Sequence, residues 1–527
     1  MRILWSSNSP FCSTGYGQQT AIACRHIKDM GHDVAILAYY GLQGSKVDWG
    51  DIPMYPNNTN DFGVKYAGLF YKDFKADLFL TLTDAWVLGK LDRDLKWVAW
   101  MPVDHDPVPP MVVDALKYNP KNPSTSSLAL IKPIAMSRFG QTQLKNNDIE
   151  SYYIPHMINT ELYKPSVEWH KIGRERYGWQ DKFVIGTVGT NHEQRKNWVA
   201  GMRAVSKFSK MHPGEVIFYM HTNPFDERGI DLQRLRSILE IEDITKFPSM
   251  SDMTTGIPME TMARMYNALD VFLLPTRGEG FGIPIVEAMS CGVPVITTNC
   301  TAQKEICKDS GAWMIKDLLP IWTGQNSWQF DSNPDEIVEL LEKAYHSKKK
   351  GSIQYRKEQS RKKALEYSDS HFEEYWKPVL ADIEERIKAP KNMEGIQSWR
   401  LPFIPNTCMP RKVLDLGAGV TQPYRKYLEA MGEYVGVDIR GGEDNIVADA
   451  HKLPFEDNTF GFVWCSEMLE HVENPKAVVE ECKRVAKHGV ILFSTPANSS
   501  FRLDPEHKAV KGVDYSTLST GDGLITW

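Results

Sequence analysis

The sequence lacks any run of about 18 consecutive apolar residues, the length that a membrane-spanning helix needs. This absence excludes a transmembrane segment. The first residues, MRILWSSNSPFCSTGYG, turn polar at Ser6 and do not supply the apolar run of about 7 or more residues that a secretory signal requires. We therefore expect a protein that is not secreted and that touches a membrane, if at all, only peripherally.

Cysteine is sparse, with 8 residues in a chain of 527 and no C-x-x-C pair. A disulfide framework needs a higher density, and the usual zinc sites need closely spaced cysteine pairs. The cysteines are therefore expected to be free thiols, and their usage predicts a reducing, cytoplasmic environment.

A strong excess of charge is also missing, because 61 Lys and Arg against 67 Asp and Glu give a net charge of −6. This balance excludes a surface that attracts nucleic acid over its whole extent. One segment, residues 343–363, is nevertheless rich in Lys and Arg. It is either a local patch for anionic lipid or nucleic acid, or the solvated face of a helix, and the scarcity of interleaved aromatic residues favours the helix face.

What the sequence does have is an ordinary globular composition, 42% hydrophobic and 24% charged, over a length that predicts two to four domains of roughly 150 residues. Short β-branched runs alternate with longer helical patterns. This rhythm predicts an α/β protein of βαβ units, with parallel sheets covered by helices and ligands at the carboxyl ends of the strands. The expected strands are 3–6, 34–38, 78–82, 97–101, 184–188, 216–219, 271–274 and 295–297.

Two interruptions of the pattern suggest domain boundaries. The rhythm pauses at 158–165, and four prolines with little periodicity mark 388–411 as a linker. Pro378 is expected to break or kink the helix predicted at 369–387. The predicted domains, each built on a Rossmann-like sheet, are 1–165, 166–387 and 412–527.

The most informative stretch is PTRGEGFGIPIVEAMSCGVPV, from Pro275 to Val295. A strand runs into a Gly-rich loop, and a helix starts near Pro284, a residue favoured at a first helical position. Free backbone N–H groups at that start, together with the helix dipole, suit a diphosphate. Glu279 and Glu287 can face one ligand from two sides, and a carboxylate suits a vicinal diol such as that of a ribose.

Together these residues resemble the E-x7-E motif of retaining glycosyltransferases with two Rossmann-like domains, the GT-B fold, and are most similar to glycosyltransferase family 4. The resemblance covers about residues 1–385 and implies that a sugar leaves a nucleotide donor with its anomeric configuration retained. It implies that Glu287 binds the donor ribose and that Glu279 is catalytic without being a nucleophile. The expected contacts of the donor sugar and phosphate are Glu279 and the backbone of Gly280, Phe281 and Gly282.

Two other loops resemble parts of the same family. TVGTNHEQRKN is similar to the loop that supplies two basic residues to the diphosphate: Lys196 matches the second, while the first position is Thr190 and Arg195 is its candidate replacement. STGYGQQTA is similar to the first loop between donor and acceptor, where Gly15 and Gly17 are the binding candidates. Without the family context, this second loop reads equally well as a simple turn.

A further strand end carries WVAWMPVDHDPVPP, in which His105 is similar to the family's active-site His near the donor sugar. Asp104 and Asp106 also match the D-x-D signature of metal-dependent glycosyltransferases of the other main fold, where two carboxylates hold a divalent cation. Because a helix dipole and Lys196 can neutralise a diphosphate instead, we expect no metal.

The C-terminal part opens with VLDLGAG, a strand that leads into a G-x-G turn, and continues with YVGVDIR, a strand that ends in an acid. Asp438 follows Gly417 by 21 residues, close to the spacing at which an acid reaches a ribose diol. The loop lacks the full G-x-G-x-x-G of a pyrophosphate binder, so a ligand without phosphates is preferred.

With ADAHKLPFEDNTFGFVWCSEMLEHV, this part resembles class I methyltransferases that use S-adenosylmethionine. About thirty residues remain after the last predicted strand, 490–494, fewer than this fold usually adds, so the domain is expected to be shortened. The implied cofactor contacts are Asp415, Gly417, Gly419, Asp438 on the ribose and Asp449 on the adenine.

The combined expectation is a bifunctional transferase that moves a sugar from a nucleotide-sugar donor and has a C-terminal domain that binds S-adenosylmethionine. The acceptor stays open among a glycan, a lipid, a protein and a nucleic-acid base. The alternatives are a sugar-nucleotide epimerase or a phosphorylase on the same fold, and a non-catalytic protein that binds a nucleotide sugar without turning it over.

Overall fold

The computed structural model divides the chain into two compact units, Met1–Lys388 and Ala389–Trp527. The predicted linker, apart from Lys388, and everything after residue 494 lie outside the described residues. The described residues are 1–59, 61–88, 91, 95–117, 131–191, 195–249, 251–252, 256–388, 412–419, 422, 424–429, 432–442, 444–466, 468–486 and 490–494.

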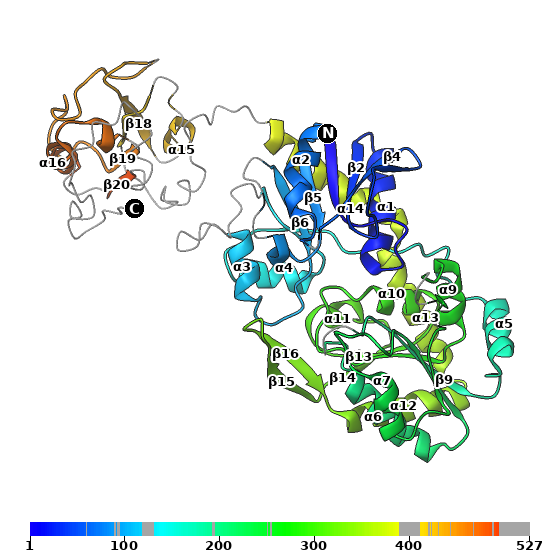
Figure 1. Cartoon of the computed structure of the whole chain (residues 1–527). Coiled ribbons are helices and arrows are strands. Elements are labelled where there is room, and N and C mark those ends of the chain that lie inside the picture. The colour runs from blue at the N-terminus through cyan, green and yellow to red at the C-terminus, as the bar shows by residue number, and fades with distance from the viewer. Residues whose placement is uncertain are drawn as a thin grey trace. The chain divides into compact units, whose positions relative to one another are not determined.

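An eight-stranded sheet forms the first part of unit 1 (Figure 1). Its strands are β1 (Arg2–Asn8), β2 (Asp33–Tyr40), β3 (Val47–Trp49), β4 (Ile52–Pro56), β5 (Leu78–Leu82), β6 (Trp97–Met101), β7 (Ile134–Ala135) and β8 (Tyr152–Tyr153). They lie in the order β3-β4-β2-β1-β5-β6-β7-β8, parallel throughout except for the β3–β4 pair. Every residue of β5 and β6 is buried, as in a parallel sheet that helices cover on both faces.

A six-stranded, entirely parallel sheet forms the second part of unit 1. Its strands are β9 (Phe183–Val188), β10 (Val216–His221), β11 (Thr245–Lys246), β12 (Val271–Leu274), β13 (Val295–Thr298) and β14 (Trp313–Ile315), in the order β11-β10-β9-β12-β13-β14. An antiparallel hairpin of β15 (Leu318–Trp322) and β16 (Trp328–Ser332) follows β14 and belongs to neither sheet.

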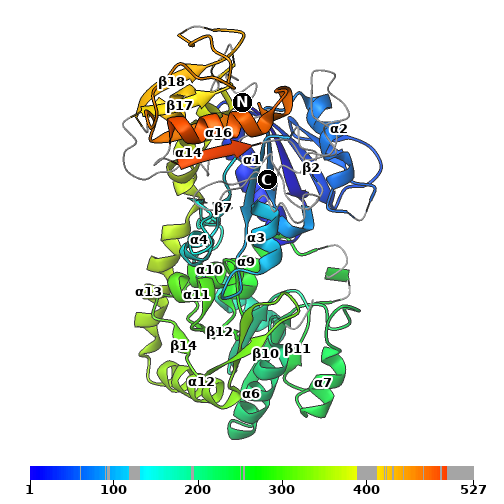
Figure 2. The same cartoon turned by 90° about the vertical axis from the view of Figure 1, so that its left-hand side faces the viewer.

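Helices connect the strands of both sheets. In the second part α6 packs against α12 and α10 against α13 (Figure 2). The helices of unit 1 are α1 (Gly15–Asp29), α2 (Val64–Phe74), α3 (Pro110–Leu116), α4 (Arg138–Lys145), α5 (Val167–Tyr177), α6 (Trp198–Met211), α7 (Leu232–Ile238), α9 (Met259–Asn267), α10 (Ile283–Ser290), α11 (Thr301–Ile306), α12 (Pro334–Lys349), α13 (Ile353–Ala364) and α14 (Phe372–Lys388), with short 3-10 turns η1 (Ala85–Leu88), η2 (Leu365–Tyr367) and η3 (Asp369–His371). No helix of the described residues is long and apolar enough to cross a membrane.

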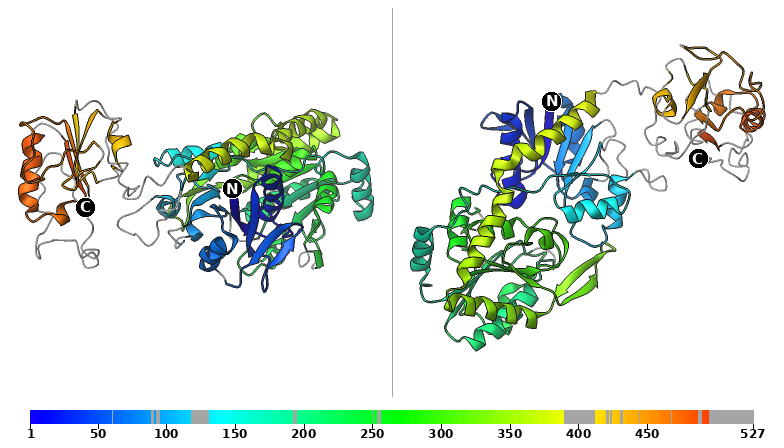
Figure 3. Two further views of the ribbon diagram at one scale, coloured as in Figure 1. Left: turned by 90° about the horizontal axis from the view of Figure 1, so that it is seen from above. Right: turned by 180° about the vertical axis from the view of Figure 1, so that it is seen from behind.

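Helix α14 returns to the first sheet, where it packs beside α1 (Figure 3). Its Trp376 is fully buried between Trp5 of β1 and Trp100 of β6, with ring centroids 6.1 and 5.1 Å away. The helix runs through Pro378 without interruption, so of the expected break or kink at this residue the break is wrong. The packing of Trp376, two residues earlier, favours the continuous helix, since tertiary contacts can outweigh a local cost of about 3 kcal/mol.

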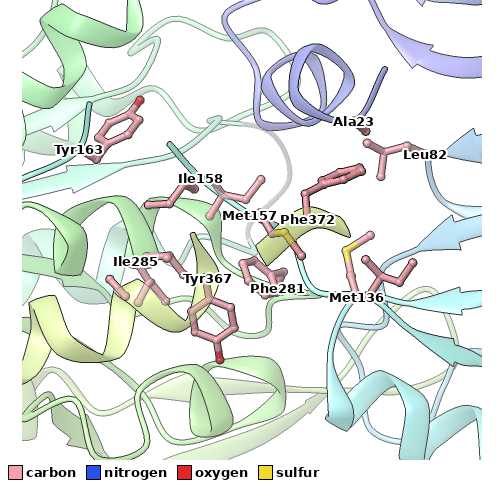
Figure 4. Close-up of a cluster of buried hydrophobic side chains, with 14 of the residues drawn as sticks. Ala23, Leu82, Met136, Met157, Ile158, Tyr163, Phe281, Ile285, Tyr367 and Phe372 are labelled. Carbon is pink, nitrogen blue, oxygen red and sulfur yellow. The ribbon is translucent and has the colours of Figure 1, made fainter. Parts of the chain in front are cut away.

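One hydrophobic core joins the two sheets of unit 1. It draws Leu82 and Met136 from the first part and Phe281 and Ile285 from the second, and Phe372 of α14 lies among them (Figure 4). Because neither sheet can bury this surface alone, the loops at their facing ends are held together by apolar packing.

Unit 2 holds a four-stranded parallel sheet in the order β18-β17-β19-β20 within its described residues. Its elements are β17 (Lys412–Leu416), α15 (Arg425–Glu429), β18 (Glu433–Val437), β19 (Phe462–Ser466), the 3-10 turn η5 (Leu469–His471), α16 (Pro475–Val485) and β20 (Val490–Ser494). The predicted α/β class is therefore confirmed in both units.

The cysteines among the described residues are all free, as predicted. The basic segment 343–363 lies on α12 and α13, where several of its cations bind within the chain. Lys348 bonds to Asp270, Lys349 bonds to Glu215, and Arg361 donates to the carbonyl of Tyr163. These contacts support the interpretation of the segment as a helix surface.

Asp270 anchors three segments in the interior of the second sheet. Its Oδ2 lies 2.6 Å from Nη2 of Arg174 and 2.9 Å from Nζ of Lys348, and it accepts the backbone N–H of Val184 at 2.8 Å. Burial alone would raise the pKa of Asp270, but the two cations outweigh burial and lower it. The ionised carboxylate therefore stabilises the fold at neutral pH.

We expect Asp270→Ala to lower the melting temperature of unit 1 by about 4–6 °C, because it leaves the buried Arg174 without its counter-charge, a loss of about 3–5 kcal/mol. The contribution of Asp270 to the stability of the wild type should be lost as the pH falls below the ordinary Asp range. The reason is that the pKa of Asp270 is lower in the folded protein than in the unfolded chain. Calorimetry of both proteins measures this. Asp335→Ala, which removes an exposed partner of Lys207, is the control, and it should change the free energy of unfolding only by the small contribution of an exposed ion pair. Equal shifts of the melting temperature in the two variants would contradict the role assigned to Asp270.

Candidate functional site

The candidate site of unit 1 lies where four loops meet, each following the carboxyl end of a parallel strand. These strands are β1 and β6 of the first sheet and β9 and β12 of the second. A Cβ added to Gly278, in the loop after β12, would lie 2.1 Å from the carbonyl oxygen of Asp104, in the loop after β6. The two halves of unit 1 are therefore in direct backbone contact at this point.

Glu279 lies at the centre of the site and is 5% exposed. Lys196 Nζ bonds to its Oε1 at 2.6 Å and Arg195 Nη1 to its Oε2 at 2.7 Å, so each carboxylate oxygen faces one cation. Burial alone would raise the pKa of Glu279, but Arg195 and Lys196 outweigh burial and hold it at about 2. The predicted pair Arg195 and Lys196 thus converges on the predicted Glu279.

His105 and Asp104 extend this cluster into the first half of unit 1. His105 is 2% exposed, and its Nδ1 lies 2.6 Å from Asp104 Oδ1, while Asp104 Oδ2 lies 3.5 Å from Arg195 Nε. Burial would raise the pKa of Asp104, but the bond to His105 and the charge of Arg195 lower it. A continuous chain of polar contacts thus runs from the predicted His105 to the predicted Glu279.

Glu287 has a contrasting environment on α10. It is 4% exposed, its Oε2 accepts the hydroxyl of Tyr266 at 2.8 Å, and its Oε1 has no hydrogen-bond partner among the described residues. Burial raises the pKa of Glu287 to about 7, and the side chains of Tyr266, Tyr163 and Gln18 oppose that rise. A buried oxygen without a partner can bind a donor such as a ligand hydroxyl group.

The glycines of the site have a role that the sequence did not indicate. A Cβ at Gly280 would lie 2.3 Å from Cβ of Pro102, and one at Gly15 would lie 3.1 Å from Cδ1 of Ile283. Gly282 precedes α10 with a φ of 104°, which only glycine adopts at low cost. At Gly280 and Gly15 the missing side chains allow the two halves to approach, and the expected contact of this backbone with a ligand stays a prediction.

Gly17 and Phe281 are also placed by packing. A Cβ at Gly17 would lie 2.3 Å from the carbonyl oxygen of Cys12, and its N–H donates to Thr14 Oγ1, the N-cap of α1. The ring of Phe281 is buried, with its centroid 5.3 Å from that of His156. Thr190, at the position of the missing basic residue, is exposed.

Two residues that we did not select support the site. Thr301 Oγ1 accepts the backbone N–H of Glu279 at 3.0 Å. Glu305 accepts the N–H groups of Arg138 and Phe139 at 2.8 Å each, and so ties α11 to the first turn of α4. The sequence signal for Glu305 is its place after the central motif, where the resembled family has a Gly pair before a Glu. Cys300 and Thr301 precede Glu305 here, which weakens that part of the match.

The two aspartates of the D-x-D pattern face different partners. Asp104 binds His105 and Arg195, whereas Asp106 Oδ1 accepts from Gln143 Nε2 at 3.0 Å. Among the residues that the structure describes, no group of three His, Cys, Asp or Glu side chains is arranged to hold a metal ion. Transfer without a metal stays a prediction.

The candidate site of unit 2 lies at the ends of β17 and β18. Asp438 is 6% exposed, and its oxygens accept the backbone N–H groups of Gly419 at 2.9 Å and Arg440 at 2.8 Å. Asp415 is buried, accepts the hydroxyl of Tyr434 at 2.9 Å, and has a pKa that burial raises to about 7.

The other two cofactor candidates of unit 2 differ in their settings. Gly417 has a φ of 79°, and a Cβ there would lie 2.7 Å from Cγ of Met468, so the turn requires glycine. Asp449 lies on the surface, where its carboxylate bonds to Nδ1 of His451 at 2.7 Å. The structure thus joins Gly419 to Asp438 but places Asp449 in no contact with them.

The stability of the protein should depend on pH through Glu287. Its carboxyl ionises near 4.5 in an unfolded chain and near 7 in the fold, so stability falls as the pH rises between these values, by about 3 kcal/mol in total. We expect Glu287→Gln to gain melting temperature relative to the wild type between pH 5 and pH 8. Glu358→Gln, on the exposed face of α13, is the control. A difference in melting temperature between Glu287→Gln and the wild type that does not change with pH would contradict the buried environment assigned to Glu287.

Two protein-family models match the chain. Residues 182–324 match the model described as "Glycosyl transferases group 1". This match covers the second sheet and strand β15 of the hairpin, and it includes Lys196, Glu279 and Glu287. Residues 414–494 match the model described as "Methyltransferase domain", which covers the sheet of unit 2.

Curated relatives divide between the same two regions. O-antigen chain mannosyltransferase B of Escherichia coli is 47% identical over 55 residues, 10% of this chain and 14% of the relative. GDP-mannose-dependent alpha-(1-6)-phosphatidylinositol monomannoside mannosyltransferase of Mycolicibacterium smegmatis is 28% identical over 31% of this chain and 42% of the relative. Ubiquinone biosynthesis O-methyltransferase of Hahella chejuensis is 31% identical over 26% of this chain and 64% of the relative. The chain therefore spans less than two thirds of each of these relatives.

Solved structures resemble unit 1 in fold. Sucrose-phosphate synthase from Thermosynechococcus elongatus superposes with a TM-score of 0.56 at 12% identity, over 72% of this chain and 99% of that one. Anabaena HepE in complex with UDP and glucose superposes with a TM-score of 0.53 at 15% identity, over 72% of this chain and 100% of the HepE chain. With the family matches, this likeness confirms the expected architecture: the chain joins a glycosyl transferase group 1 domain of the GT-B fold to a C-terminal methyltransferase domain.

Proposed function

We propose that unit 1 transfers a sugar from a nucleoside diphosphate donor to an acceptor hydroxyl and retains the anomeric configuration. The observation that carries this proposal is the contrast between two glutamates eight residues apart. Glu279 is ionised between Arg195 and Lys196, whereas Glu287 is buried with one oxygen unsatisfied. A donor has matching parts, a charged diphosphate for the cations and a ribose diol for Glu287.

The charges of the site supply the electrostatic part of the mechanism. Arg195 and Lys196 are balanced by Glu279 and Asp104, so an incoming diphosphate has to compete with a carboxylate for the same cations. When the bond between the sugar carbon and the phosphate oxygen breaks, negative charge grows on the phosphate. The two cations then stabilise that charge, and the burial of Lys196 reduces the screening of this interaction by water.

Retention is assigned to attack from the face that the phosphate leaves. The acceptor oxygen bonds to the anomeric carbon, the carbon–phosphate oxygen bond breaks, and the leaving phosphate oxygen takes the acceptor proton. A double displacement would instead need a carboxylate nucleophile. Glu279 is poorly suited to that role, because both of its oxygens are held by cations that lower its basicity. Its proposed role is to position Arg195 and Lys196 and to bind the sugar.

For unit 2 we propose binding of S-adenosylmethionine, which supplies a methyl group to a nucleophile. The residues present fit this group: Asp438 is a buried acid at a strand end, and Gly417 and Gly419 form a left-handed turn beside it. Asp438 would hold the ribose hydroxyls and the turn would admit the methionine portion. Because the two units share one chain, the product of one site is at a raised local concentration for the other.

The donor base can be identified by ligand-induced stabilisation of the purified full chain. We expect one of GDP, UDP, ADP and dTDP to raise the melting temperature, since a ligand that binds only the folded state stabilises it by mass action. GDP and UDP come first, because a relative is named for GDP-mannose and a structural neighbour for its complex with UDP. S-Adenosylhomocysteine should raise the melting temperature of unit 2 in the same way.

Two variants assign these shifts to their sites. Glu287→Gln should lose the nucleotide shift and keep the shift with S-adenosylhomocysteine, and Asp438→Asn should do the reverse. No shift with any nucleotide would contradict the glycosyltransferase proposal. A nucleotide shift without any turnover of the donor would favour the binding-protein alternative, and conversion of the donor sugar without an acceptor would favour the epimerase.

We expect Glu279→Gln to lower kcat by about 100-fold or more with a smaller change in KM, because it removes the charge that positions Arg195 and Lys196. Steady-state kinetics with the identified donor test this, and NMR of the product determines the anomeric configuration. Glu358→Gln, on the exposed face of α13, is the control and should leave kcat unchanged. Unchanged donor turnover in Glu279→Gln, or an inverted product, would contradict the mechanism.

A further inference from the structure

The β15–β16 hairpin is an addition to the second sheet and lies on the same side of it as the candidate site. Its two strands form a ladder with each other and belong to neither large sheet, and Trp328 of β16 also forms an isolated antiparallel bridge with Asp106 (Figure 1). Neither the candidate catalytic residues nor the proposed donor contacts lie on it. The hairpin is therefore free of the roles assigned so far.

Three contacts fix this hairpin to the loops of the site. The N–H of Asp106 donates to the carbonyl of Trp328 at 3.1 Å, directly after His105 in the chain. The N–H of Phe330 donates to the carbonyl of Arg277 at 3.0 Å, beside the Gly-rich loop. Ser327 Oγ donates to the carbonyl of Pro107. The hairpin is thus joined to both halves of unit 1, at the residues that flank the reaction centre.

One face of the hairpin is aromatic and open to solvent. Trp322 and Trp328 are directly opposite in the register, and Pro320 lies two residues from Trp322 on the same face. Trp322 is 57% exposed and Trp328 is 41% exposed, and their ring centroids are 4.8 Å apart with the planes 73° to each other. Two exposed tryptophans in contact are costly to leave in water unless they bind something.

The same hairpin carries almost no charge. Between residues 318 and 332 the sequence has one ionisable side chain, Asp331, and this residue binds Asn197 Nδ2 at 2.7 Å and Arg277 Nη2 at 3.4 Å. The turn supplies instead the amide side chains of Gln325 and Asn326, which both donate and accept hydrogen bonds. The chemistry of this surface is aromatic and polar without being ionic.

We propose that the face formed by Pro320, Trp322 and Trp328 binds an uncharged oligosaccharide segment of the acceptor. One face of a pyranose ring carries C–H groups of slight positive charge, which the negative face of an indole attracts, while the sugar hydroxyls can bond to amides at the turn. Since the hairpin adjoins His105, an acceptor chain held there can reach the reaction centre. This inference rests on the proposed function and specifies its acceptor class.

A membrane surface is the rival partner for exposed tryptophans. Interfacial protein surfaces combine aromatic residues with Lys and Arg that face anionic headgroups. The hairpin strands and turn contain no Lys or Arg, and the nearby Arg277 is engaged by Asp331. The lack of positive charge therefore favours a neutral glycan over an anionic lipid surface.

The test uses the full chain and an array of neutral manno-, gluco- and galacto-oligosaccharides. We expect the wild type to bind at least one neutral series, and Trp322→Ala and Trp328→Ala each to weaken this binding by about tenfold, the effect of losing one stacked aromatic contact. Tyr355→Ala removes an aromatic side chain that is 66% exposed on α13 and should change nothing. All variants should keep the wild-type melting temperature and nucleotide shift, which verifies the fold and the donor site.

Several outcomes would overturn this inference: no binding to any neutral oligosaccharide, equal binding by the wild type and both Trp variants, or Trp-dependent binding to phosphatidylglycerol vesicles in place of glycans. Its failure is distinguishable from failure of the proposed function. A nucleotide shift without Trp-dependent glycan binding contradicts only the hairpin's role. Trp-dependent glycan binding without a nucleotide shift supports the glycan surface and contradicts the glycosyltransferase proposal.

Discussion

The charge balance around Glu279 is the constraint on which the rest of the candidate site depends. Two cations and two carboxylates lie in a region where burial makes any unpaired charge expensive. The residues come from both halves of unit 1, so the balance is complete only while the halves are closed on each other. The proposed diphosphate would therefore have to compete with a carboxylate for the two cations of this network.

The two glutamates illustrate how one sequence motif produces two kinds of carboxylate. Glu279 and Glu287 are chemically identical and lie on one loop and the helix that follows. Two cations bind the first, whereas only the uncharged side chains of Tyr266, Tyr163 and Gln18 offset the burial of the second, so the pKa of the first is lowered and that of the second is raised. Such divergence is characteristic of sites in which acids have different tasks. It arises entirely from partners that are distant in the chain.

The hairpin and the glycines show that the same junction is shaped for close approach. Gly278 and Gly280 remove side chains where the loop after β6 presses against the loop after β12, and the hairpin bonds to both loops from outside. Unit 2 uses a simpler version of this design, in which Asp438 at the end of one strand accepts one backbone N–H from the turn after the neighbouring strand and one from its own following loop. The units share the principle that parallel strands direct their following loops to one edge.

The sequence by itself determined the α/β class, the motif residues and the longer buried strands, because these depend on local periodicity and on short spacings. The short or half-exposed strands, among them the β15–β16 hairpin, were not predicted. The runs at 78–82, 97–101 and 271–274 coincide with β5, β6 and β12 to the residue, and the predicted Glu279, Arg195 and Lys196 do converge. The tertiary structure alone decided that α14 continues through Pro378, that the glycines serve contact between the halves, and that Thr301 holds the backbone of Glu279. It also decided which acid is ionised, since the energy of a buried charge is set by its neighbours in space, and these lie from 20 to more than 80 residues away along the chain.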